Sequence, residues 1–217
     1  MGNGRHCCLT EQCHRRGLAE ACSDDDSREQ FSRLIASDTS PAAGPDFPRP
    51  CTGGPFAAVE RLAEGLRQRG EDSIPVSTEL VRLADESRPV EVRQVCLNAC
   101  CAATWKLEDS WVIQVSARAT PQRRRVSVFH EAFHIMAHSR SPVAPAFRRR
   151  GSEDGCFNEL LADHFAVCVL TPRHHVSPRW ARTPDLEQIA RAFDVPPPVM
   201  RQARRPAPES KYKISAG

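Results

Sequence analysis

Residues 126–138, with the sequence VSVFHEAFHIMAH, constrain the fold of this chain more than any other segment. They are apolar on nearly every side apart from three ionisable residues near the centre, His130, Glu131 and His134. A helix without a polar face is expected to be buried by other elements. Buried ionisable groups raise the free energy of the folded state unless they pair with one another or bind a metal ion. The chain is therefore expected to fold around this helix, with the three side chains serving one site.

These residues form the pattern H-E-x-x-H. Residues four apart lie one turn apart on the same helix face, so His130 and His134 can bind one metal ion. Zinc suits them because it accepts neutral imidazole nitrogens in a tetrahedral shell. Glu131 is rotated by about 100° from His130, so its carboxylate can face the open coordination position and take a proton from a metal-activated water. The pattern predicts a zinc site with Glu131 as the catalytic residue.

A catalytic zinc ion needs a third protein ligand. A second helix is expected over residues 158–170, ended by Pro172. Glu159 and Asp163 lie four residues apart, on one face of that helix. We expect Glu159 to complete the metal shell and Asp163 to orient a ligand histidine through its other ring nitrogen. The alternative is a solvated acidic stripe, but the apolar residues around the pair favour the ligand interpretation.

The rest of the chain divides into three parts. Residues 1–54 contain an acidic cluster and a Pro/Gly/Ser-rich stretch, which predicts a Cys- and Pro-rich extension of low order. Residues 55–205 are expected to form one α+β domain, with a small sheet packed on the H-E-x-x-H helix and a mostly helical C-terminal half. Residues 206–217 form a polar tail. The other expected elements are helices over 56–70, 76–86 and from Thr183 onward, and strands over 90–97 and 111–117 separated by a turn at 107–110.

Composition excludes several classes of protein. The formal net charge of +3 is close to neutral for 217 residues, so direct nucleic-acid binding is not expected. No run of about 18 apolar residues occurs, which argues against a membrane span. The first residues lack the apolar stretch of a secretory signal, so we expect a cytoplasmic protein. In that compartment the ten cysteines are expected to be thiols or metal ligands rather than disulfides.

Four further histidines are weaker candidates. His138 lies one turn beyond His134 and is either a supporting contact or a helix-end residue. The second interpretation is favoured, because zinc rarely takes four protein ligands in a hydrolytic site. His164 is a possible oxyanion stabiliser, although it points about 100° away from its neighbour Asp163. His174 and His175 are expected in a loop after the second helix, from which either one can reach the site. The sequence does not choose among these histidines.

Cysteines offer two further possibilities. A second zinc site is conceivable near the N-terminus, but its spacing fits no regular zinc finger and free thiols are favoured. The residues concerned are Cys7, Cys8, Cys13, His14 and Cys22. Cys156 and Cys168 flank or lie on the Glu159 helix, where a soft thiolate could inhibit a nearby zinc ion.

Three segments resemble the ImmA/IrrE metallopeptidases, the M78 or DUF955 family. They are FHEAFHIMAH, NELLADHFAVCVLTP and DLEQIARAFDVPPPVM. The family pattern falls on His130, Glu131, His134 and His138, and then on Glu159, Ala162, Asp163, Phe165, Ala166, Leu170 and Pro172. The resemblance covers roughly residues 56–205. It implies a gluzincin-like fold and a zinc-dependent endopeptidase that cleaves helix-turn-helix repressors to relieve repression of mobile-element or stress-response genes.

Two other functions compete with this one. The segment LEQIARAFDVPPPVMRQARR superficially resembles the first two helices of a helix-turn-helix, as in a DNA-associated regulator without peptidase activity. However, three prolines are expected in its turn, and it offers few polar side chains for base edges. The other alternative is an inert zinc-holding scaffold, since the sequence contains no obvious oxyanion stabiliser.

Overall fold

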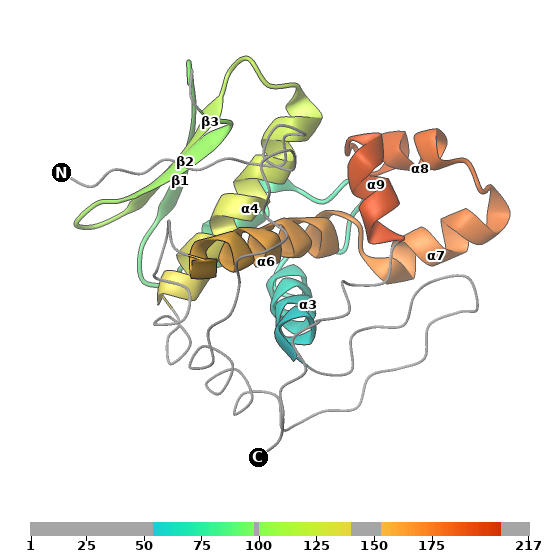
Figure 1. Cartoon of the computed structure of the whole chain (residues 1–217), viewed down its shortest axis with the longest axis horizontal. Coiled ribbons are helices and arrows are strands. Elements are labelled where there is room, and N and C mark those ends of the chain that lie inside the picture. The colour runs from blue at the N-terminus through green and yellow to red at the C-terminus, as the bar shows by residue number, and fades with distance from the viewer. Residues whose placement is uncertain (1–53, 98–99, 140–152, 205–217) are drawn as a thin grey trace.

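The computed structural model describes residues 54–97, 100–139 and 153–204, with residues 138–139 and 153–157 described by their backbone alone. The predicted N-terminal extension, apart from Gly54, and the polar tail lie outside this part of the chain. The described residues form an α+β fold with a three-stranded sheet and mostly helical remainder (Figure 1). The elements are α3 (Gly54–Arg67), the 3-10 helix η1 (Thr78–Ala84), β1 (Val90–Val95), β2 (Ala102–Lys106), β3 (Trp111–Ser116), α4 (Pro121–Ser139), α6 (Glu153–Leu170), α7 (Arg173–Arg182), α8 (Leu186–Ala192) and α9 (Pro197–Ala203).

The sheet has the strand order β1-β3-β2, with β1 parallel and β2 antiparallel to β3. Strands β1 and β3 were expected, but the sequence analysis missed β2. Alanine and lysine, which supply three of the five residues of β2, are depleted in strands. The predicted turn therefore joins β2 to β3, where the amide of Leu107 donates to the carbonyl of Ser110 at 2.8 Å.

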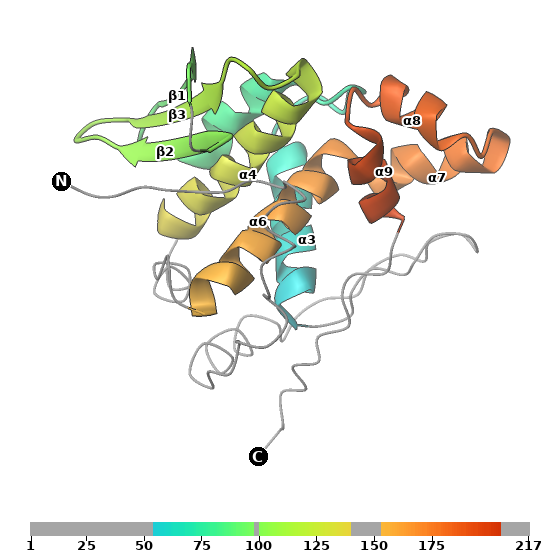
Figure 2. The same cartoon turned by 45° about the horizontal axis from the view of Figure 1, so that its top comes forward.

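Helix α4 is the central element and lies between the sheet and α6 (Figure 2). Its described side chains from Val126 to Ala137 are all buried, as the apolar sequence predicts. On the other side of α6, helix α3 packs against it. The sheet, α4, α6 and α3 thus follow one another, and the two predicted metal-binding helices are neighbours in the middle.

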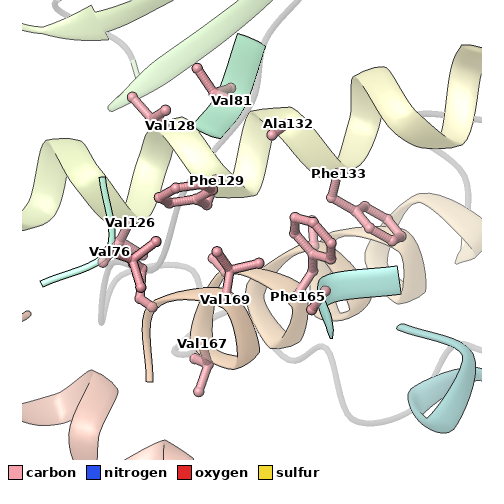
Figure 3. Close-up of a cluster of buried hydrophobic side chains, with 14 of the residues drawn as sticks. Val76, Val81, Val126, Val128, Phe129, Ala132, Phe133, Phe165, Val167 and Val169 are labelled. Atoms are coloured by element: carbon pink, nitrogen blue, oxygen red, sulfur yellow. The ribbon is translucent and has the colours of Figure 1, made fainter. Parts of the chain in front are cut away.

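Aromatic side chains fill the space between α4 and α6 (Figure 3). Phe129 and Phe133 from α4 and Phe165 from α6 are each at most 1% exposed. The rings of Phe133 and Phe165 lie 5.6 Å apart between centroids. Each buried phenylalanine side chain contributes about 1.5–3 kcal/mol to stability. This packing holds α4 against α6 next to the polar centre described below.

The C-terminal helices differ from the prediction. Helix α7 occupies the stretch expected to be a loop, with Pro172 at its N-cap in an extended conformation. Helix α8 begins at Leu186 rather than Thr183, because the Asp185 side chain accepts hydrogen bonds from the first free amides of the helix. The three prolines do not form a turn: Pro196 is the N-cap and Pro197 the first residue of α9, where proline is well tolerated.

Within the described residues, no helix combines the length and apolarity needed to cross a membrane.

Candidate metal centre

Helices α4 and α6 bring three potential ligands to one point. Nε2 of His130 lies 3.3 Å from Nε2 of His134. The Glu159 carboxylate faces both rings, with Oε2 at 3.0 Å from His130 and Oε1 at 3.3 Å from His134. The histidine side chains are only 1% and 3% exposed, while that of Glu159 is 29% exposed. The cluster is therefore buried on the α4 side and opens toward solvent at Glu159.

These distances are compatible with a shared metal ion. A neutral imidazole Nε2 carries either one proton or one lone pair, so it makes one good hydrogen bond at a time. Here Nε2 of His130 has two partners, the carboxylate of Glu159 and Nε2 of His134. Two nitrogens bound to one tetrahedral zinc ion at the usual bond lengths would lie about 3.4 Å apart. The observed nitrogen–nitrogen distance of 3.3 Å agrees with that geometry.

Asp163 fixes the orientation of the His130 ring. Nδ1 of His130 donates to Oδ1 of Asp163 at 2.7 Å. When Nδ1 alone carries a proton, as metal binding requires, the lone pair of Nε2 points toward the other ligand atoms. Metal-bound histidines usually have such a carboxylate partner on the second ring nitrogen. The structure thus brings Asp163 to the second ring nitrogen of His130.

Burial and the hydrogen bonds within the cluster shift the pKa values of its members. Burial lowers the pKa of His130, but hydrogen bonds to Asp163 and Glu159 outweigh burial and raise the pKa to about 10. Burial lowers the pKa of His134, so that ring is held neutral. Burial raises the pKa of Glu159, but its hydrogen bonds with both histidines hold the pKa well below its usual value. The raised pKa of His130 favours its protonated form in the metal-free site.

Glu131 is fully buried at 0% exposure beside this cluster. Its Oε2 atom accepts a hydrogen bond from the Thr104 hydroxyl at 2.6 Å. Its Oε1 atom has no hydrogen-bond partner among the described residues. A buried carboxylate oxygen without a partner is costly, and such an atom commonly marks a site for water or a ligand. The arrangement therefore leaves Oε1 available to a water molecule.

Thr104 is the residue that sequence reasoning missed at this site. It lies on β2, the strand that was not predicted, and 27 positions before Glu131. No spacing rule connects a strand residue with a helix residue at such a separation. Only the packing of β2 on α4 brings the two side chains together.

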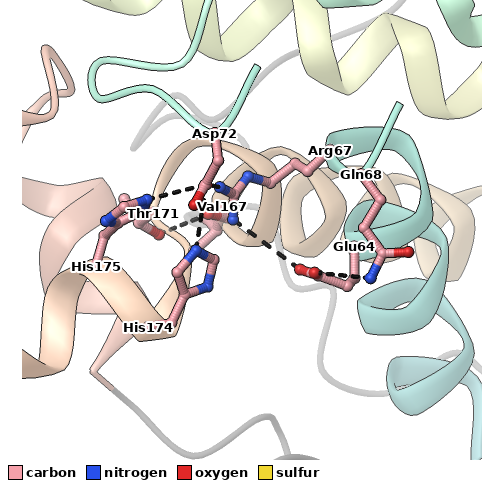
Figure 4. A network of polar contacts seen from close by, with 8 residues as sticks. All are labelled: Glu64, Arg67, Gln68, Asp72, Val167, Thr171, His174 and His175. Atoms are coloured by element: carbon pink, nitrogen blue, oxygen red, sulfur yellow. Dashed lines mark hydrogen bonds and ion pairs between the residues drawn. The ribbon is translucent and has the colours of Figure 1, made fainter. Parts of the chain in front are cut away.

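The weaker histidine candidates lie elsewhere or cannot be placed. The His138 side chain lies outside the described part. The His164 ring contacts Glu60 of α3 at 3.4 Å rather than the metal ligands. His174 and His175 both contact Oδ1 of Asp72, at 3.3 and 2.9 Å (Figure 4). They lie in α7, so the expectation of a loop reaching the site was wrong for them.

None of the candidate cysteines is found at the metal centre within the described residues. The N-terminal cysteines and the Cys156 side chain lie outside the described residues. Cys168 lies nine residues after Glu159 on α6, which corresponds to about half a turn around the helix. Its Sγ atom is 3.5 Å from Nε2 of His164. The thiol therefore faces away from the Glu159 side of α6, and the idea that it inhibits the same metal ion has no support.

The described residues thus form an α+β domain in which two adjacent helices bring together two histidines and a carboxylate. The three side chains lie beside the buried Glu131. The sequence profile of the peptidase M78 family, described as the IrrE N-terminal-like domain, matches residues 87–203, which is 117 of the 217 residues. The chain therefore belongs to the peptidase M78 family, the ImmA/IrrE family that the sequence motifs indicated. Membership implies a metal and suggests metallopeptidase activity.

A solved structure of a Mycobacterium tuberculosis transcriptional regulator is similar with a TM-score of 0.45 and 13% identity, over 81% of this chain and 50% of that chain. The present chain thus spans half the length of that protein. At this level the similarity supports no argument about function. No curated protein sequence matches the chain.

Proposed function

We propose that this protein is a zinc-dependent endopeptidase with a gluzincin-like arrangement of its site. His130, His134 and Glu159 would hold the zinc ion, and Glu131 would be the catalytic residue. The observation that carries the proposal is the unpartnered Oε1 atom of Glu131, buried on the turn between the two histidines. A scaffold that only held a metal would have no need for this uncompensated carboxylate oxygen.

Each side chain at the site would have a separate role in peptide hydrolysis. A bound zinc ion would polarise the peptide carbonyl and activate water for attack. Glu131 takes the proton of the attacking water on Oε1 and delivers it to the leaving amine as the peptide bond breaks. Thr104 keeps Oε2 occupied, so that Oε1 remains the atom presented to the reaction. Asp163 keeps His130 in the tautomer that binds metal.

The sheet offers a place for the peptide substrate. Strand β2 is an edge strand in the order β1-β3-β2, and its Thr104 reaches the catalytic carboxylate. An extended peptide can add to such an edge through main-chain hydrogen bonds. Trp105, the next residue of the strand, is 39% exposed and would offer apolar surface to substrate side chains on the opposite face of the sheet. A peptide bound in this way would run beside the metal centre.

The substrate that the family resemblance favours is a helix-turn-helix transcriptional repressor, whose cleavage would relieve repression of mobile-element or stress-response genes. The protein is expected to work in the cytoplasm, with a protein partner rather than a membrane or nucleic acid. A gel shift at low salt tests the competing DNA-associated regulator, because phosphate contacts are strongest there.

The decisive experiment uses Glu131→Gln, which keeps the shape of the side chain and removes its basicity. We expect this variant to retain zinc, measured by mass spectrometry of metals, and to lose cleavage of a repressor encoded beside the gene. Glu79→Gln, an exposed change in η1, is the matched control and should cleave at the wild-type rate. Full activity of Glu131→Gln would refute the role of the base. Zinc retention by a wild-type protein without peptidase activity on a panel of such repressors would favour the scaffold instead.

A further inference from the structure

A second set of potential ligands lies between α3 and α6. It consists of Glu60, His164 and Cys168, whose carboxylate oxygen, ring nitrogen and sulfur lie within 4.8 Å of one another. We propose that this set is a second metal site, separate from the candidate catalytic centre, that takes zinc or another thiolate-binding divalent ion. The proposal goes beyond peptidase activity and does not depend on it.

Local geometry preforms the site. His164 and Cys168 are four residues apart on α6 and therefore lie one turn apart on one face. Glu60 comes from α3, which packs against that face (Figure 2). The Phe56 ring meets the His164 ring edge-on, with centroids 5.1 Å apart and an interplanar angle of 89°. This contact restricts the orientation of the imidazole before any ion binds.

The contacts within the cluster converge on a single nitrogen. Nε2 of His164 lies 3.4 Å from Oε1 of Glu60 and 3.5 Å from Sγ of Cys168. One ring nitrogen has either a proton or a lone pair, and so cannot serve both neighbours well. The nitrogen–oxygen distance is also beyond the range of a good N–H···O bond, about 2.7–3.2 Å. Hydrogen bonds to His164 by themselves therefore explain the convergence on this nitrogen poorly.

A tetrahedral metal ion explains the same distances. With the usual zinc bond lengths, nitrogen and oxygen ligands lie about 3.4 Å apart and nitrogen and sulfur ligands about 3.6 Å apart. The observed separations of 3.4 and 3.5 Å match both values. Cysteine, histidine and glutamate are all common zinc ligands, and a thiolate disfavours the hard cations Mg²⁺ and Ca²⁺. Three protein ligands leave a fourth position for water.

Two other interpretations of such clusters fit less well. A nucleophilic cysteine with a histidine base and an orienting carboxylate uses both ring nitrogens, one for each partner. Here Glu60 and Cys168 approach the same nitrogen of His164. The cluster of Asp72, His174 and His175 is explained by hydrogen bonding without a metal ion (Figure 4). There the shared atom is a carboxylate oxygen, which can accept several donors, and it is already paired with the guanidinium of Arg67.

The second ion would connect α3 to the helix that carries the catalytic ligand. Glu159 lies on the opposite face of α6 from Cys168. Fixing α6 against α3 would limit the movement of Glu159 relative to the two histidines of α4. Binding requires the thiolate, so the Cys168 proton passes to solvent as the sulfur–metal bond forms. The expected role is structural support for the first site.

Cobalt(II) distinguishes the two sites because only one of them contains sulfur. We expect the full chain, reduced with a phosphine and titrated with cobalt chloride, to bind two equivalents. One of them should produce a near-ultraviolet thiolate-to-cobalt charge-transfer band. In Cys168→Ser this band should be lost and one equivalent should remain. Cys96→Ser, a change at an exposed thiol, is the matched control and should retain the band.

A second pair of variants separates this proposal from the first. In His130→Ala/His134→Ala the thiolate band should persist although the candidate catalytic site is removed. His164→Gln should weaken the band, and circular dichroism should confirm that the helices remain. Absence of the band in wild-type protein, or its persistence in Cys168→Ser, would overturn the second site without affecting the proposed peptidase.

Discussion

The Thr104 hydroxyl donates a 2.6 Å hydrogen bond to Oε2 of Glu131, joining strand β2 to helix α4 at the candidate catalytic carboxylate. This contact occupies Oε2 and leaves Oε1 of Glu131 without a hydrogen-bond partner among the described residues. It also connects the edge strand, where we propose that the peptide binds, to Glu131, the proposed proton acceptor.

Thr104→Val removes the hydroxyl and keeps the β-branched shape. We expect kcat for repressor cleavage to fall about tenfold or more, a part of the ~10²–10⁴-fold that general-base catalysis contributes. Zinc content should not change, because Thr104 contacts no proposed ligand in the described structure. Thr104→Ser restores the donor and should recover most of the activity. Equal kcat values for Thr104→Val and the wild-type protein would show that the Thr104 hydroxyl has no part in positioning Glu131.

Asp163→Asn tests the orientation of His130. The amide can no longer compensate the charge on the ring, and it can present an NH₂ group where Nδ1 needs an acceptor. We expect zinc affinity, measured by competition with a chelating dye, to fall about 10–100-fold. Asp109→Asn, at an exposed position in the turn before β3, should leave the affinity unchanged. An unaltered affinity for Asp163→Asn would show that the hydrogen bond is incidental.

Zinc binding should release about one proton at the first site near neutral pH. His130, with a pKa raised to about 10, is protonated there in the metal-free protein, whereas the lowered pKa of His134 leaves that ring neutral. Affinity should therefore rise about tenfold per pH unit until His130 loses its proton. Calorimetric titrations of Cys168→Ser in two buffers of different ionisation enthalpy give the number of protons. Zero protons would contradict the assigned charge of His130.

Phe165→Ala tests the packing that positions the centre. This side chain is 0% exposed between α4 and α6, so its removal should cost about 3–5 kcal/mol of unfolding free energy. Urea denaturation followed by circular dichroism measures the difference. Leu160→Ala, at a 37% exposed position of the same helix, should cost much less. Similar losses for the two variants would mean that the interface between α4 and α6 contributes little to stability.

Sequence reasoning succeeded best where the relevant geometry is local. His130 and His134 lie one turn apart on any helix, and so do Glu159 and Asp163, which permitted the prediction of convergence before the fold was known. The buried helix α4, the strands β1 and β3, and most of α6 follow from the same short-range patterns. Sequence reasoning failed at β2, where three of the five residues have weak strand propensity. It also failed at α7, which begins directly after Pro172, the residue expected to end the preceding helix.

The sequence by itself determined the family, the α+β class and the residues that face one another along each helix. Tertiary structure alone decided that Thr104 reaches Glu131 and that Glu60 joins His164 and Cys168. The physical reason is the separation in sequence of the residues involved. Side-chain positions within one helix depend on a fixed rise and rotation per residue, whereas contacts between elements depend on how their buried faces pack.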